Sequence, residues 1–139
     1  MRSMRTVACA IIVTTGVVCL TGSALAADMT AAEIKAFLSG KTVYLEATTA
    51  SASGQAGQGV IYWAEDGTAL YKTPNGAMFH GKWEIKGNSN CAEWKERPAM
   101  GCVRYDKTGD VVTVIDVASG QARAKIMKTA PGNPEKLAP

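Results

Sequence analysis

Apolar and polar residues alternate in short segments along most of the chain after residue 40, and turn-forming residues separate these segments. A period of two is typical of strands that bury one face. In residues 77–86, for example, Phe79, Trp83 and Ile85 fall on one face while His80 falls on the other. The segments expected to be strands are 41–47, both arms of 60–73, 77–86, the cysteine-containing 89–105, 111–117 and 121–128.

Two connections have strong turn signals. Asp66-Gly67 lies between aromatic and β-branched runs, which predicts a hairpin with a positive φ at Gly67. Residues 73–76 (TPNG) predict a second turn, and the small-residue stretch 48–59 predicts a mobile loop.

The last hairpin allows a register to be predicted. If Ser119-Gly120 is a two-residue loop, Asp116 faces Arg123 across the strands as an opposite-charge pair. We prefer this register to a three-residue loop, because one face then stays nearly free of charge. That face would contain Val111, Thr113, Ile115, Val117, Ala122, Ala124 and Ile126.

One short amphipathic helix is expected before the first strand. Thr30 and Glu33 have the spacing of a capping box, and Gly40 lies where a helix would end. The apolar stripe consists of Ile34, Phe37 and Leu38. We expect this stripe to plug or cover a sheet; the alternative is a partner-binding helix.

Hairpin connections throughout, without β–α–β alternation, indicate an all-β chain of about seven or eight strands. We predict a small antiparallel meander barrel with one short N-terminal helix, because closure removes exposed strand edges. A two-sheet sandwich is the alternative. The domain is expected to span 27–139, with a tail from about residue 130 that is either an ordered strap or disordered.

The first 26 residues have the pattern of a secretory signal peptide. Two arginines precede an apolar run over 7–20, and small residues at Ala24 and Ala26 suit a cleavage site. The run is shorter than the roughly 20 residues of a membrane-spanning helix. We therefore expect a soluble product in the periplasm or outside the cell, without stable membrane insertion.

Cleavage after Ala26 would remove two arginines and leave 13 basic against 12 acidic residues. A nearly neutral chain lacks the basic surface typical of nucleic-acid binding. Cys9 and Cys19 would also be removed, leaving Cys91 and Cys102. In an oxidising compartment this pair favours a disulfide over a metal site or a nucleophile, since the chain has one histidine.

Few residues are candidates for catalysis. Glu65-Asp66 lies in a predicted turn, where an aspartate has a structural use, and His80 lies on the polar face of its strand. Glycines in 54–59 lack the spacing of a nucleotide-binding loop. We expect no enzymatic activity, no cofactor and no metal.

Aromatic residues are the better candidates for a site. Most should fill a barrel interior, and some could line an apolar ligand site. We place Trp94 at a rim, because polar residues follow it. The candidate contact residues are Tyr62, Trp63, Tyr71 and Trp94.

The chain contains the motifs LSGKT, YW-x-x-DG, GKW, C-x-x-W with a second cysteine, and GNPEKL. In this pattern it resembles small exported proteins of alphaproteobacteria that form a domain family of unknown function. The resemblance covers nearly all of 30–137 and implies a compact β domain of the cell envelope, with no catalytic residue assigned. The matching residues are Gly40, Asp66, Gly67, Gly81, Trp83, Cys91, Trp94, Cys102 and Gly132.

These observations predict a non-enzymatic periplasmic module that binds a small apolar ligand or an envelope protein. One alternative is an inhibitor of an envelope hydrolase such as lysozyme. A second is an enzyme that uses His80, which would require that side chain to lie in a pocket.

Overall fold

The computed structural model describes residues 25–139, apart from the side chains of residues 99 and 100. The predicted signal peptide, residues 1–26, lies outside the described residues except for its last two. No helix among the described residues is long and apolar enough to cross a bilayer.

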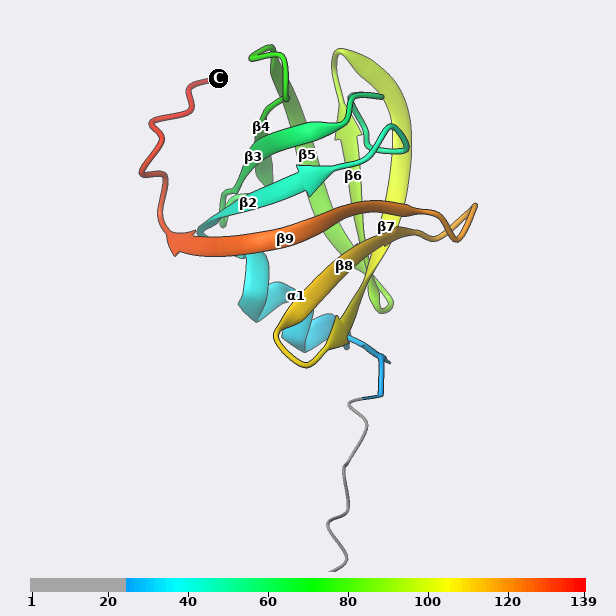
Figure 1. Cartoon of the computed structure of the whole chain (residues 1–139). Helices are drawn as coiled ribbons and strands as arrows, with labels where there is room; N and C mark the ends of the chain where they lie inside the picture. The colour runs from blue at the N-terminus through cyan, green and yellow to red at the C-terminus, as the bar shows by residue number, and fades with distance from the viewer. Residues whose placement is uncertain (1–24) are drawn as a thin grey trace, which may run out of the picture.

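Eight strands form a closed antiparallel barrel (Figure 1). Each strand from β2 to β8 pairs with the next along the chain, and β9 returns to pair with β2. The predicted meander barrel is confirmed and the sandwich alternative is wrong. The barrel strands are β2 (Lys41–Ala47), β3 (Gly57–Trp63), β4 (Thr68–Lys72), β5 (Met78–Lys86), β6 (Ser89–Trp94), β7 (Arg97–Thr108), β8 (Val111–Asp116) and β9 (Ala122–Pro131). A ninth, two-residue strand, β1 (Ala27–Asp28), pairs with β7 in addition.

The helix α1 (Ala31–Leu38) closes one end of the barrel (Figure 1). The capping box is present: the Glu33 N–H donates to Thr30 Oγ1, and the Thr30 N–H donates to Glu33 Oε2. Gly40 follows the helix with φ 69°, as expected of a residue just beyond a helix end. Ile34 and Leu38 are fully buried, which stabilises the fold by about 1.5–3 kcal/mol each. The predicted plug is therefore confirmed.

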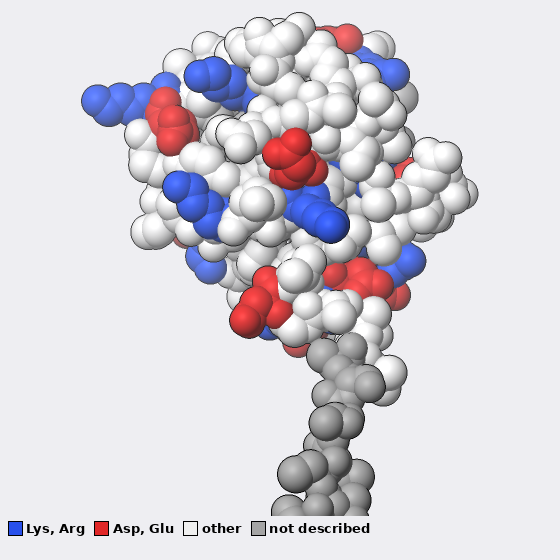
Figure 2. All heavy atoms as spheres, viewed as in Figure 1, with Lys and Arg blue, Asp and Glu red and all other residues white. Residues whose placement is uncertain are grey.

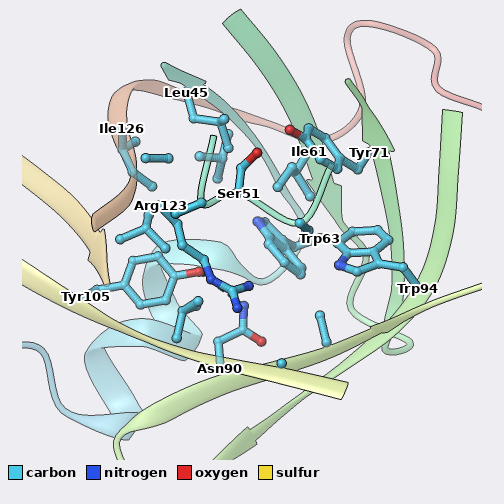
Figure 3. A pocket seen from close by; sticks show the side chains of 18 of the residues that line it. Leu45, Ser51, Ile61, Trp63, Tyr71, Asn90, Trp94, Tyr105, Arg123 and Ile126 are labelled. Atoms are coloured by element: carbon cyan, nitrogen blue, oxygen red, sulfur yellow. Dashed lines mark hydrogen bonds between the residues drawn. The ribbon is translucent and has the colours of Figure 1, made fainter. Parts of the chain in front are cut away.

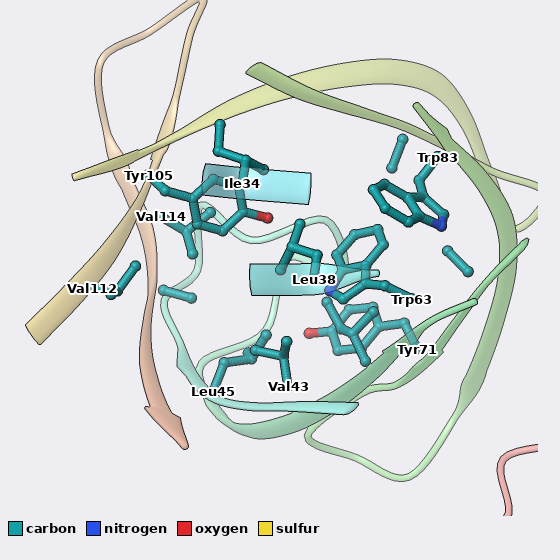
Figure 4. Packing of buried hydrophobic residues seen from close by; sticks show 14 of the residues in the cluster. Ile34, Leu38, Val43, Leu45, Trp63, Tyr71, Trp83, Tyr105, Val112 and Val114 are labelled. Carbon is teal, nitrogen blue, oxygen red and sulfur yellow. The ribbon is translucent and has the colours of Figure 1, made fainter. Parts of the chain in front are cut away.

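The core lies between this helix and the inward faces of the strands (Figure 4). Ile34 and Leu38 project into the ring of strands, where Val43, Trp63 and Tyr105 surround them. Alternate strand residues therefore point inward, as the period of two predicts.

The turn predictions are confirmed for the β3–β4 and β4–β5 hairpins. Gly67 has φ 88° and Gly76 has φ 86°. The loop after β2 is shorter than predicted, because β3 begins at Gly57 and pairs there with Ala47. Only residues 48–56 therefore connect β2 to β3.

The predicted register of the β8–β9 hairpin is wrong. The connection spans residues 117–121, and the pairing shifts between Val114 and Ile115. Val112, Val114 and Asp116 are buried, whereas Val111 is 50% exposed. The predicted pair does form, since Arg123 Nη2 lies 2.6 Å from Asp116 Oδ1.

The C-terminal segment after β9 is an ordered strap. The Gly132 N–H donates to the Gly40 carbonyl at 2.8 Å, and Thr42 Oγ1 donates to the Gly132 carbonyl at 2.7 Å. The Tyr44 hydroxyl donates to Glu135, and Leu137 is buried. The strap thus fastens to the outer face of β2.

Charged residues of both signs are interspersed on the face of the molecule shown in Figure 2. Acidic and basic side chains alternate over this face and do not gather into a patch of one sign.

Candidate functional site

A cavity of about 420 Å³ occupies the barrel interior beyond the helix plug. Its lining comes from β2, β3, β4, β6, β7, β8 and β9, and from the loop that follows β2. Because α1 leads into the start of β2, that loop lies at the opposite end of the barrel (Figure 1). The helix and the loop therefore bound the cavity along the barrel axis.

Hydrogen bonds hold residues 48–56 over the end of the barrel opposite the helix. Arg97 Nη1 donates to the Ala52 carbonyl at 2.6 Å, and Thr48 Oγ1 donates to the Ala122 carbonyl at 2.8 Å. Ser53 and the Tyr71 hydroxyl are 3.3 Å apart. These contacts link the loop to β4, β7 and β9 and partly cover the cavity.

Aromatic rings form one wall of the cavity (Figure 3). The Trp94 ring centroid is 6.1 Å from that of Trp63 and 5.7 Å from that of Tyr71. Phe79 packs behind them, 5.9 Å from Tyr71. Aliphatic side chains complete the apolar lining: Val43, Leu45, Ile61, Val103, Val114 and Ile126.

Three glycines inside the strands make room for large lining side chains. A Cβ atom at Gly59 would lie 2.8 Å from the Tyr71 ring, and one at Gly81 would lie 2.8 Å from the Trp94 ring. At Gly101, a Cβ would lie 3.3 Å from the Arg123 guanidinium. Glycine within a strand often marks such close approach.

A polar cluster lies on the cavity wall formed by β6, β7 and β9. Asn90 is 1% exposed, and its Nδ2 donates to the Tyr105 hydroxyl at 3.1 Å. Arg123 reaches the same wall (Figure 3). Its Nη2 pairs with Asp116 Oδ1. Asn90 Oδ1 and Arg123 Nε are buried and have no hydrogen-bond partner within the described part of the chain.

Burial and hydrogen bonding set the charges in this cluster. Loss of solvent raises the pKa of Tyr105 to about 12, so its phenol is neutral at neutral pH. Hydrogen bonds from Ser119 hold the pKa of Asp116 below its ordinary value, and the charge of Arg123 adds to this effect. Arg123 and Asp116 therefore form an ionised pair without net charge.

The structure brings together three of the four predicted contact residues. The cavity is lined by Trp63, Tyr71 and Trp94. Tyr62 directly precedes Trp63 in β3, so its side chain points to the outer face of that strand. Trp94 is 5% exposed and lies inside the barrel, so its predicted place at a rim is wrong.

His80 lies on the outer face of β5, away from the cavity. The His80 ring Nδ1 is 2.7 Å from Glu96 Oε1, and the His80 backbone N–H donates to Glu96 Oε2 at 2.8 Å. The polar face of this strand was expected to leave His80 solvated; instead the ring is held by one carboxylate. The pocket position that an enzyme based on His80 would require is not observed.

The predicted disulfide between Cys91 and Cys102 is confirmed. The two cysteines are directly opposite on β6 and β7. The bond therefore fastens together two strands that line the cavity.

Sequence reasoning missed Asn90, Tyr105 and Arg123 as site residues. Alternation was the available signal, because Asn90 is four residues before Trp94 and shares its face. Tyr105 is likewise four residues after Gly101, on the inner face of β7. Each carries a polar group on an otherwise apolar inner face, and this feature could have identified Asn90 and Tyr105 as site residues.

Comparison of the chain with protein-family models, curated proteins and solved structures found no match. The resemblance to small exported alphaproteobacterial proteins therefore stays a prediction.

Proposed function

We propose that this protein is a non-enzymatic binding module that holds a small, largely apolar molecule inside its barrel. The cavity of about 420 Å³, walled by Trp63, Tyr71 and Trp94, is the observation that supports this function. Ligand sites typically enclose about 300–1,000 Å³ of mostly apolar lining with a few convergent polar groups. The dimensions and chemistry of this interior fit that description.

The interior site favours a small molecule over an envelope protein as the partner. Three of the four aromatic candidates for a contact surface, Trp63, Tyr71 and Trp94, point into the barrel, and Trp94 is buried. A disulfide is consistent with an oxidising compartment outside the cytoplasm. We extend this to the periplasm, where the protein would carry or sequester its ligand.

Binding can be tested with N-phenyl-1-naphthylamine, an uncharged probe whose fluorescence rises in apolar surroundings. Energy transfer from tryptophan should accompany binding, because Trp63 and Trp94 line the cavity. We expect saturable fluorescence enhancement together with quenching of tryptophan emission. A wild-type protein that gives no saturable enhancement contradicts the proposal.

Ala92→Leu provides the blocked variant, since Ala92 lies on the inner face of β6 and lines the cavity. Ala36→Leu is the matched control, because Ala36 is exposed on the outer side of α1. The expected result is weaker probe binding in Ala92→Leu alone. Equal binding by both variants and the wild type would place the probe outside the barrel.

A further inference from the structure

Two buried polar atoms in the cavity wall have no partner among the described residues. Asn90 Oδ1 is an acceptor and Arg123 Nε–H is a donor, and both side chains line the same cavity. Buried polar groups in folded proteins are nearly always hydrogen-bonded, because leaving one unpaired is destabilising. Asn90 is 1% exposed, so bulk water does not satisfy it.

The Asn90 and Arg123 side chains reach the same cavity wall from two different strands. Asn90 projects inward from β6, while the Arg123 guanidinium extends from β9 to lie over Gly101 of β7. Gly101 pairs with Ala92, the next inward residue after Asn90 on β6. Figure 3 shows the guanidinium and the Asn90 amide on the same side of the cavity, with Trp63 and Trp94 on the other.

The charge of this cluster is already balanced. Arg123 Nη2 is 2.6 Å from Asp116 Oδ1, and Asp116 is ionised. An anionic ligand would meet a neutral ion pair, the acceptor oxygen of Asn90 and a low-dielectric apolar wall, and desolvating its charge would be costly. A neutral group that both donates and accepts matches the cluster better.

We infer that the ligand has an uncharged head group of the amide or lactam type on an aromatic or apolar body. This inference rests on the proposed binding function. The head-group carbonyl accepts a hydrogen bond from Arg123 Nε–H, and its N–H donates to Asn90 Oδ1. The body packs against the wall formed by Trp63, Tyr71 and Trp94.

Three probes with one body test the head group. 2-Naphthamide, 2-naphthoate and 2-methylnaphthalene would each compete with N-phenyl-1-naphthylamine for the purified protein. We expect the amide to bind at least tenfold more tightly than either of the other two. Equal affinities would overturn the head-group inference while leaving the proposed binding function in place.

Preference for the naphthoate would also overturn the inference, because Arg123 would then act as an anion site. If none of the probes displaces the dye and the dye itself does not bind, the binding function fails as well.

Asn90→Leu tests the role of the acceptor. The two side chains are similar in size, and the change removes both the unpaired oxygen and the bond to Tyr105. We expect the variant to fold and to bind 2-naphthamide no more tightly than 2-methylnaphthalene, so that the preference for the amide is lost. Met127→Leu is the control, because Met127 is a 65% exposed residue of β9 outside the cavity lining, and this variant should keep the preference. A full amide preference in Asn90→Leu would refute the assignment.

Discussion

Gly81→Ala perturbs the packing that places Trp94 in the cavity wall. Gly81 lies on the inner face of β5, directly opposite Trp94 of β6. An added Cβ would lie 2.3 Å from the Glu93 carbonyl oxygen and 2.8 Å from the Trp94 ring. Since ordinary contact begins at 3.4 Å, the backbone of one strand must move by about 1.1 Å.

This movement lowers the unfolding free energy, because it breaks a backbone hydrogen bond next to the clash. The Lys95 N–H donates to the His80 carbonyl at 2.8 Å beside the clash, and a shift of this size takes the pair beyond hydrogen-bond range. Losing that bond costs about 1 kcal/mol. Overpacking against the ring costs about 1–3 kcal/mol more, and the reduced freedom of the unfolded chain returns less than about 1 kcal/mol. We therefore expect the unfolding free energy to fall by about 1–4 kcal/mol.

Gly59→Ala is the matched control, because Gly59 is also an inward-facing strand glycine. There the three atoms nearest to the added Cβ belong to the side chains of Tyr71 and Leu45, which can move. Urea unfolding followed by far-ultraviolet circular dichroism should show a larger loss for Gly81→Ala than for Gly59→Ala. Equal losses, or a Gly81→Ala effect below about 0.5 kcal/mol, would refute the packing argument.

Three further predictions concern the disulfide and the buried titrating groups. Cys91→Ser should lower the unfolding free energy by roughly 3 kcal/mol, because Cys91–Cys102 closes a loop with a sequence separation of 11; unchanged thermal unfolding would contradict this. The folded pKa of Tyr105 lies above its ordinary value of 10, so stability present below pH 10 should be lost between pH 10 and 12, by about 2–3 kcal/mol. In Tyr105→Phe, the unfolding free energy measured with urea should no longer fall between pH 10 and 12. If the variant loses as much stability over this range as the wild type, burial of Tyr105 is not the cause of the loss. The folded pKa of Asp116 is depressed, so its stabilisation should be present above pH 3.8 and lost as the pH falls below that value. Asp116→Asn should remove this acid dependence, whereas an identical acid transition would show that the carboxylate is not held by Ser119 and Arg123.

Local signals in the sequence were sufficient to predict most of the architecture. The capping box at Thr30, the positive-φ turn at Gly67 and the paired cysteines each act through contacts close in sequence or through compartment chemistry. Uninterrupted hairpins then leave closure as the simplest way to cover both edges. For these reasons the barrel, its plug and its disulfide were predictable.

The β8–β9 register was not predictable from face polarity. Both faces of β8 contain β-branched residues, so the assumption of a charge-free inner face decided between them. The structure instead buries Asp116 beside Arg123, and the pairing shift after Val114 makes this arrangement fit. An ion pair inside a barrel depends on tertiary geometry that alternation does not encode.

The cavity itself also depends on distant residues. Gly59, Gly81 and Gly101 are far apart in sequence, yet each leaves space for a different lining side chain. Strand alternation places these residues on inner faces, but only the closed barrel shows what lies over them. The sequence therefore predicted the aromatic wall in part and the polar wall not at all.

The most direct test of an internal binding site is nuclear magnetic resonance of the protein titrated with N-phenyl-1-naphthylamine. If the probe binds inside the barrel, the Trp63 and Trp94 indole N–H signals should shift saturably, with intermolecular contacts from the probe to Tyr71 and Ile126. Shifts confined to outer-face residues such as Tyr62, or no saturable shift at all, would contradict an internal site.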